Sequence, residues 1–265
     1  MWNDLTIGMY MPGDSLVHRL ESRTKLAAVC LTMVAIFLAV DWPGVIALTA
    51  LLLLAYRAAS LPWGLALAGF RPLLWILVIA LPLQLLLTAG EPLLSLGSLT
   101  VTREGVIQSG WLLFRLGALV FTASLLTLTT SPVALADGLE KLLKPLERVK
   151  LPAHELAMVI TIALRFIPLF SEEADKISKA QKARGAEIDS GRLTKRIKAL
   201  ASILVPLLVG AFRRADELAI AMESRCYRGG RGRTRLRRET WGRGDFITLA
   251  ATLILLFYTL WERMT

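Results

Sequence analysis

The stretch LAAVCLTMVAIFLAV, residues 26–40, contains no charged residue and lies between Lys25 and Asp41. Such a run is typical of a helix in a membrane, where about 20 residues cross the hydrocarbon core. The whole chain has the same character, because 55% of its 265 residues are hydrophobic and its mean hydropathy is +0.56. Ordinary soluble domains are about 45–50% apolar. The sequence therefore predicts a membrane protein.

Four further apolar runs follow, at residues 44–55, 72–89, 106–130 and 246–260. The first two runs of the chain are short, and they reach the length of a span only with flanking residues. We predict an all-α polytopic membrane protein with about five transmembrane helices.

Charged residues beside these runs predict the orientation of the chain. Five basic residues that flank the first three runs are expected on one side: Arg19, Arg23, Lys25, Arg57 and Arg71. The connection at residues 90–105 is expected to be a loop on the other side, where Arg103 is matched by Glu104. Because Lys and Arg are retained in the cytoplasm during insertion, the N-terminus is predicted to be cytoplasmic and the C-terminus outside.

The net charge of +10 comes from one internal segment. Residues 131–243 hold 23 of the 31 Lys and Arg residues but 13 of the 21 acids. No RNA-binding, zinc-finger or basic-zipper pattern interrupts them, so we attribute the excess to the cytoplasmic side of a membrane protein rather than to nucleic-acid binding. The expected organisation is an N-terminal membrane domain (1–130), a cytoplasmic helical insertion (131–243) and a last transmembrane helix (244–265).

The basic segment is predicted to be helical. In EEADKISKAQKA, residues 172–183, acids precede lysines by four positions, which supports an exposed helix. Five later residues are spaced as one apolar stripe of a helix: Leu208, Ala211, Ala215, Leu218 and Met222. Two apolar pieces, 157–170 with Pro168 and 200–212 with Pro206, are short for a span. We expect them at or near the membrane face, and the alternative is that either enters the bilayer.

Patterns for catalysis or metal binding are weak. Glycine is never followed by lysine, so the chain lacks a Walker-type phosphate loop. The two histidines, His18 and His154, have no Cys or carboxylate at the ligand spacing of a zinc site. The S-x-x-K match at residues 22–25 lacks the partner motifs of that hydrolase family. We expect no catalytic residue, no metal site and no bound cofactor in this chain.

The run at 106–130 carries two features that affect packing. Arg115 is a charge at membrane depth, so it must face protein or water, and both a structural and a functional role are open. Gly110, Gly117 and Ser124 recur every seven residues and form a seam that another helix can approach closely. Packing within the chain is the favoured interpretation, and the alternative is a docking groove for a separate membrane subunit.

Two helix ends in the basic segment resemble each other. Ala183-Arg184-Gly185 follows the charged helix, which Gly185 is expected to terminate. Ser224-Arg225-Cys226 follows the apolar stripe. Small neighbours let an arginine enter a narrow pocket, where its planar guanidinium can bind a carboxylate through two hydrogen bonds. Two similar ends predict two similar sockets on partner proteins.

At these residues the sequence resembles the transmembrane (T) component of energy-coupling factor transporters, which are ABC-type importers of vitamins and metals. Three stretches carry the resemblance: GDSLVHRLESRTKL (13–26), LRFIPLFSEEADKISKAQKARG (164–185) and RADELAIAMESRCYRGG (214–230). The resemblance implies that Arg184 and Arg225 end two coupling helices, each of which enters a groove on one of two cytosolic ATPase subunits. Ser224 and Cys226 replace the Ala and Gly of the family motif, but both are small.

The resemblance also implies the partners and the mechanism. The two ATPases use ATP and Mg, and a substrate-binding S component lies beside this chain in the prokaryotic cell membrane. The stripe from Leu208 to Met222 is expected to contact the S component, as are Gly110 and Gly117. The opening IGMYMPGDSLVHRL (7–20) is similar to members that serve several S components, rather than one dedicated to cobalt, nickel or biotin. The expected function is a non-catalytic subunit that transmits ATPase motion to the S component.

Two other classes are the alternatives. A membrane-embedded enzyme acting on lipid or prenyl substrates needs clustered acids or a nucleophile near a membrane boundary, whereas the acids here are dispersed. A stand-alone carrier needs acidic groups inside its spans or an internal repeat, and neither is evident.

Overall fold

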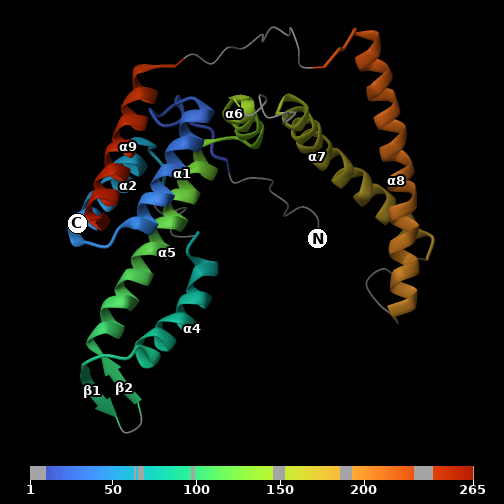
Figure 1. Cartoon of the computed structure of the whole chain (residues 1–265). Helices are drawn as coiled ribbons and strands as arrows, with labels where there is room; N and C mark the ends of the chain where they lie inside the picture. Colours follow the sequence, from blue (N-terminus) through green and yellow to red (C-terminus); the bar gives the residue numbers. More distant parts are fainter. Residues whose placement is uncertain are drawn as a thin grey trace. The chain divides into compact units, whose positions relative to one another are not determined.

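The computed structural model describes residues 10–62, 64, 69–96, 99–145, 153–185, 193–229 and 241–264. Helices make up most of the described chain (Figure 1), which confirms the all-α class. The helices belong to two compact units. The bundle unit comprises Gly8–Leu139 and Glu239–Thr265, and the paired-helix unit lies within Glu140–Arg238.

Four helices form the centre of the bundle unit: α1 (Ser22–Leu38), α2 (Trp42–Ala58), α5 (Arg103–Thr129) and α9 (Arg243–Met264). Helix α1 packs against the other three, and α2 also contacts α5 and α9. Apolar side chains such as Ile36, Leu48 and Ala118 are buried where these helices meet. A helix satisfies its own backbone hydrogen bonds, which is what lipid demands of a charge-free run such as residues 26–40.

Helix α4 (Arg71–Leu87) packs along the first half of α5. Gln84 Nε2 donates to Gln108 Oε1 over 2.8 Å. The hydroxyl of Thr102 caps α5 by accepting from the Gly105 backbone N–H at 3.1 Å, and it donates to the carbonyl of Thr88 at 2.8 Å. One buried threonine therefore joins the end of α4 to the start of α5.

A β-hairpin connects α4 to α5. Strands β1 (Pro92–Leu96) and β2 (Leu99–Thr102) pair antiparallel, so the expected loop at 90–105 contains regular structure. Gly97-Ser98 between two apolar stretches is the sequence signal that indicates such a hairpin.

Three of the described helices are long and apolar enough to cross a membrane, namely α5, α9 and α7 from His154 to Ala183. Helix α2 and the Leu73–Leu87 part of α4 are shorter apolar helices, in line with the short runs of the sequence. Large apolar side chains also face outward, for example Trp75 at 77% and Ile254 at 69% exposure. A soluble protein rarely exposes so much contiguous apolar surface. These features confirm a polytopic membrane protein.

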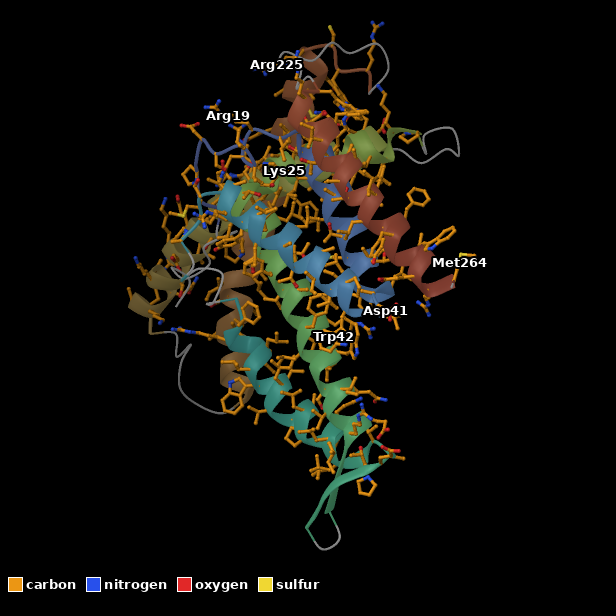
Figure 2. The ribbon with its side chains drawn as sticks, turned by 90° about the vertical axis from the view of Figure 1, so that its left-hand side faces the viewer. Arg19, Lys25, Asp41, Trp42, Arg225 and Met264 are labelled. Carbon is orange, nitrogen blue, oxygen red and sulfur yellow. The ribbon has the colours of Figure 1, made fainter. Side chains whose placement is uncertain are left out.

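The ends of the bundle unit differ in charge. Helices α1 and α9 begin where α2 and α5 end, because Lys25 Nζ donates to the Thr129 carbonyl over 3.0 Å and the Glu21 N–H donates to Asp245 Oδ1 over 2.8 Å. We name this the basic end, since it carries Arg19 and Lys25 (Figure 2). Asp41, Trp42 and Met264 lie at the opposite end (Figure 2).

Arg71 departs from the expected grouping. The Phe70 ring lies 3.6 Å from an ideal Cβ at Gly117, which places the start of α4 beside the middle of α5 and away from the basic end. The cause is that α4 pairs with the first half of α5 alone. Counting charges beside an apolar run does not detect such a shift along the helix axis.

The paired-helix unit consists of α7 (Ala153–Ala183) and α8 (Leu193–Ser224), which cross each other (Figure 1). Each helix joins an apolar piece to a charged piece of the sequence, and Pro168 and Pro206 lie inside the continuous helices. Because α7 meets the length and composition of a span, the alternative in which residues 157–170 enter the bilayer stays open. Helix α6 (Pro132–Leu143) lies between α5 and α7 in the chain.

Candidate coupling site

Contacts between α7 and α8 show that the two helices are antiparallel. Arg214 forms an ion pair with Glu173, and its guanidinium lies 5.4 Å from the centre of the Phe170 ring. Further along α7, Gln181 Nε2 donates to the Ser202 carbonyl over 3.4 Å. Later residues of α7 therefore contact earlier residues of α8. The carboxyl ends of α7 and α8 therefore lie at opposite ends of the helix pair.

The end of α8 is a complete Schellman motif, the pattern in which two N–H groups after a helix return to its last carbonyls. The Cys226 N–H donates to the Glu223 carbonyl over 2.8 Å, and the Tyr227 N–H donates to the Met222 carbonyl over 3.0 Å. The pattern requires a left-handed residue, and Cys226 supplies it with a φ of 57°. The cysteine thus occupies a position that glycine usually holds.

The end of α7 shares two features with the end of α8: a left-handed residue and the hydrogen bond that its N–H donates. Gly185 has a φ of 87°, and its N–H donates to the Lys182 carbonyl over 3.0 Å. This bond corresponds to the one from Cys226 to Glu223. The prediction that Gly185 terminates α7 is confirmed. Ala183 and Ser224 are the last helical residues, so the two motifs match position by position.

Arg184 and Arg225 occupy equivalent positions in this geometry. Each lies between the last helical residue and the left-handed residue, and both side chains are exposed. Gln181 contacts Ser202, and Arg225 follows Ser202 by about 23 residues, so the two arginine ends are separated by about 35 Å. The structure therefore presents two equivalent arginines at well-separated places.

The predicted apolar stripe on α8 divides into two faces. Ala211, Leu218 and Met222 are half-buried, whereas Leu208 and Ala215 are exposed. The exposed face continues through large residues that the predicted stripe omits: Leu204, Val205, Val209 and Phe212. The uninterrupted apolar run at 200–212 is the sequence signal for them, since a helix apolar on all sides presents more than one face.

The glycines of α5 lie in different surroundings. A Cβ at Gly117 would contact the Phe70 ring, so this glycine packs within the chain. Gly110 has open space around it and lines a cavity of about 490 Å³ with Trp42 and Trp111. The Nε of Arg115, in the same helix, is buried and has no hydrogen-bond partner among the residues that the structure describes. Of the two glycines, Gly110 is the one with free space for another side chain.

The segment that carries the two arginines begins with α6, which packs against the first turn of α1. A Cβ at Gly138 in α6 would lie 2.9 Å from the backbone carbonyl carbon of Ser22, closer than real Cβ contacts come. Only glycine lets α6 approach α1 at this distance. In the last turn of α6, Glu140 Oε1 lies 3.0 Å from His154 Nδ1 at the start of α7.

The segment returns to the same turn of α1. Arg23 lies 4.4 Å above the centre of the Trp241 ring, and its Nε donates to Glu21 Oε2 over 2.7 Å. Asp245, in the first turn of α9, accepts the Glu21 N–H. We call residues 21–23 the α1 anchor, because they hold the chain both before and after the paired helices.

Comparisons with known proteins show the family of this chain. Residues 13–236 match the family CbiQ, described as Cobalt transport protein. This chain belongs to that family. A protein of Heliobacterium modesticaldum is 48% identical over 264 residues, covering 99% of both chains. Proteins of Acidaminococcus fermentans, 46% identical over 98% of both chains, and Bacillus subtilis, 41% identical over 96% of this chain and 97% of the relative, are also similar.

Each of these relatives is named energy-coupling factor transporter transmembrane protein EcfT. The resemblance found in the sequence is thereby confirmed, and the chain is an energy-coupling transmembrane subunit of this transporter class. A subunit of this kind is named for transport and not for catalysis. In the part of the chain that the structure describes, no three His, Cys, Asp or Glu side chains could hold a metal ion together.

Proposed function

We propose that the chain transmits the motion of two cytosolic ABC ATPases to a membrane-embedded S component. Arg184 binds one ATPase, Arg225 binds the other, and the crossed α7 and α8 carry the displacement. ATP and Mg are used by the ATPases, and this chain binds no cofactor. The cargo is a vitamin or other micronutrient taken up by a prokaryotic cell, and the S components are exchanged rather than dedicated.

One observation supports this proposal above the others. Two helices of one unit end in the same backbone geometry and present an exposed arginine at the same position of that geometry. The separation of about 35 Å favours two partner subunits over one, because a standard interface buries only about 800 Å² on each side. The relatives named EcfT make partner subunits an expected part of such a transporter.

The S component has a suitable surface on α8. Leu208, at 55% exposure, and Phe212, at 71%, belong to an exposed apolar face. Gly110 on α5 is the candidate contact inside the membrane. The α1 anchor gives the motion a path into the bundle unit, since both connections of the paired helices reach it.

The basic end of the bundle unit supports the proposed topology. Arg19 and Lys25 lie at the basic end (Figure 2), and Arg57 belongs to the last turn of α2, which packs there against Val17. This end faces the cytoplasm by the positive-inside rule. The N-terminus and the paired helices are then cytoplasmic, next to the ATPases.

The test is charge reversal at the two helix ends. Arg184→Glu and Arg225→Glu are introduced singly and together, with Arg213→Glu as a matched reversal of an exposed arginine in the middle of α8. Losing one partner of a buried hydrogen-bonded charge pair costs about 2 to 5 kcal/mol. We expect each single reversal to abolish ATP-driven uptake in vesicles. We expect the double reversal to release the ATPases during purification, and Arg213→Glu to do neither.

A doubly reversed variant that keeps its ATPases and transports at the normal rate would refute the proposal. Uptake by the purified chain alone, without ATPases, would favour a stand-alone carrier instead.

A further inference from the structure

A groove lies between helices α1, α2, α5 and α9 of the bundle unit, and its volume is about 560 Å³. Buried side chains from all four helices line its floor, among them Val29, Leu52, Thr122 and Thr252. Its rim is exposed, with Leu54 on α2 and Ile247 on α9 each at 67% exposure. Because these two residues belong to membrane-embedded helices, the groove opens sideways toward lipid.

The hydroxyl protons of the threonines in the floor are already donated to backbone carbonyls. Thr32 donates to the Ala28 carbonyl and Thr122 to the Ala118 carbonyl, each over 2.7 Å. Thr129, Thr248 and Thr252 likewise donate to carbonyls of their own helices. A buried water needs two to four polar partners, and this floor offers it no hydroxyl proton. The groove is therefore suited to hydrocarbon rather than to water.

The length of the groove fits one leaflet of a bilayer. Its lining on α1 runs from Lys25 to Thr32, and its lining on α9 runs from Gly244 to Thr252. At 1.5 Å per residue these stretches are about 10 to 12 Å long. The hydrocarbon core is about 30 Å thick, so each leaflet contributes about 15 Å. The groove starts at the basic end and stops before the middle of the membrane.

The basic end supplies charge for an anionic headgroup. Arg19, Arg57 and Arg243 are exposed, and each is the immediate neighbour in sequence of a residue that lines the groove. The Lys25 ammonium is held by the carbonyls of His18 and Thr129, each at 3.0 Å.

The carboxylates at this end are partly engaged. Glu21 pairs with Arg23, and Asp245 accepts two backbone N–H groups, from Glu21 and from Gly242. Asp14 is exposed. Among the described residues at this end, exposed arginines thus outnumber exposed acids. Arginine binds phosphate through its planar fork.

We propose that an anionic phospholipid occupies this groove, with one acyl chain along the threonine-lined floor and its phosphate at Arg19, Arg57 and Arg243. The lipid enters from the leaflet at the basic end. This site is independent of the contacts proposed for the ATPases and the S component.

The experiment uses the full chain with its co-purified partners, reconstituted in nanodiscs. Trace phosphatidylglycerol with a diazirine in its acyl chain is photolysed, and labelled peptides are identified by mass spectrometry. A matched phosphatidylcholine probe tests the headgroup. We expect phosphatidylglycerol to label α1, α2 and α9 at the groove about fivefold more strongly than phosphatidylcholine.

Two kinds of variant locate the site. Ala251→Phe fills the groove from α9, and Ala55→Phe fills it from α2, whereas Ala123→Phe adds the same ring at an exposed position of α5. We expect either filling variant to lower labelling about fivefold or more and Ala123→Phe to leave it unchanged. Replacing Arg19, Arg57 and Arg243 with Gln is expected to reduce phosphatidylglycerol labelling to the phosphatidylcholine level. Each variant is compared only if its circular dichroism spectrum shows the helix content of the unaltered protein.

Three results would overturn the proposal. One is labelling spread evenly over the exposed apolar faces of the bundle unit. Another is equal labelling by the two lipids. The third is cross-linking of the groove to a co-purified membrane protein in place of lipid.

Discussion

At the scale of single residues, the left-handed position after α8 is the most informative. A non-glycine residue in this conformation costs about 1 to 2 kcal/mol, and Cys226 accepts that cost at the position where α7 has Gly185. The hydrogen bonds of the Schellman motif hold the cysteine there. The two arginine ends are thus equivalent in backbone geometry although their side chains differ.

This equivalence predicts opposite effects of two substitutions. Cys226→Gly should slow hydrogen exchange at the Tyr227 amide about fivefold, because relieving about 1 kcal/mol of backbone strain makes local opening less favourable. Gly185→Ala should accelerate exchange at the Gly185 position by a similar factor, since a methyl group would meet no atom of the described residues and would add backbone strain at the positive φ. Hydrogen exchange read by mass spectrometry checks both. Equal exchange in all variants would contradict the geometry.

Part of this site was predictable from residue types. The exposed arginines and the role of Gly185 follow from small neighbours and from the preference of helix ends for glycine. The left-handed backbone of Cys226 does not follow, because cysteine is not a residue that favours it. The sequence showed only that Ser224 and Cys226 are small, whereas the structure shows that Cys226 takes the left-handed backbone conformation of Gly185.

At the scale of elements, the approach of α6 to α1 depends on one glycine. Gly138→Val should force α6 away from Ser22, because even a Cβ would come within 2.9 Å of the backbone. We expect ATP hydrolysis by the assembled transporter to continue and uptake to fall roughly tenfold, as the motion no longer reaches the α1 anchor. Parallel assays of hydrolysis and uptake in vesicles measure the two rates.

Asp137→Val is the matched control for this prediction. It places the same β-branched side chain on the exposed face of α6, next to Gly138. Loss of uptake in both variants would assign the effect to helix propensity and would contradict a role for the contact with Ser22.

Apolar runs in the sequence predict some of the elements and miss others. Helices at residues 26–40 and 106–130 follow from long apolar runs, because lipid admits few other backbone structures. The hairpin at 92–102 and the position of Arg71 beside the middle of α5 do not follow, since both depend on how α4 pairs with α5. Hydrophobic length predicts that a segment is buried in the membrane but leaves its depth undetermined.

At the scale of the whole molecule, the charge difference between the two ends of the bundle unit predicts its orientation. In a Cys30→Ala, Cys226→Gly background, an impermeant maleimide should label Glu91→Cys in intact cells and Asp14→Cys only after permeabilisation. Both positions are exposed, and they lie on opposite sides of the predicted topology. The reverse labelling pattern would place the paired helices outside and would exclude contact with cytosolic ATPases.

The α1 anchor has a consequence for chimeras in which related chains swap the paired-helix unit. Because the polypeptide leaves and re-enters the bundle unit at neighbouring points, the roughly hundred residues from Glu140 to Arg238 form an insertion whose ends are close together. Such insertions can be replaced without altering the host fold. A chimera that takes this stretch from a relative should therefore acquire the donor's ATPases while it keeps its own lipid-facing helices.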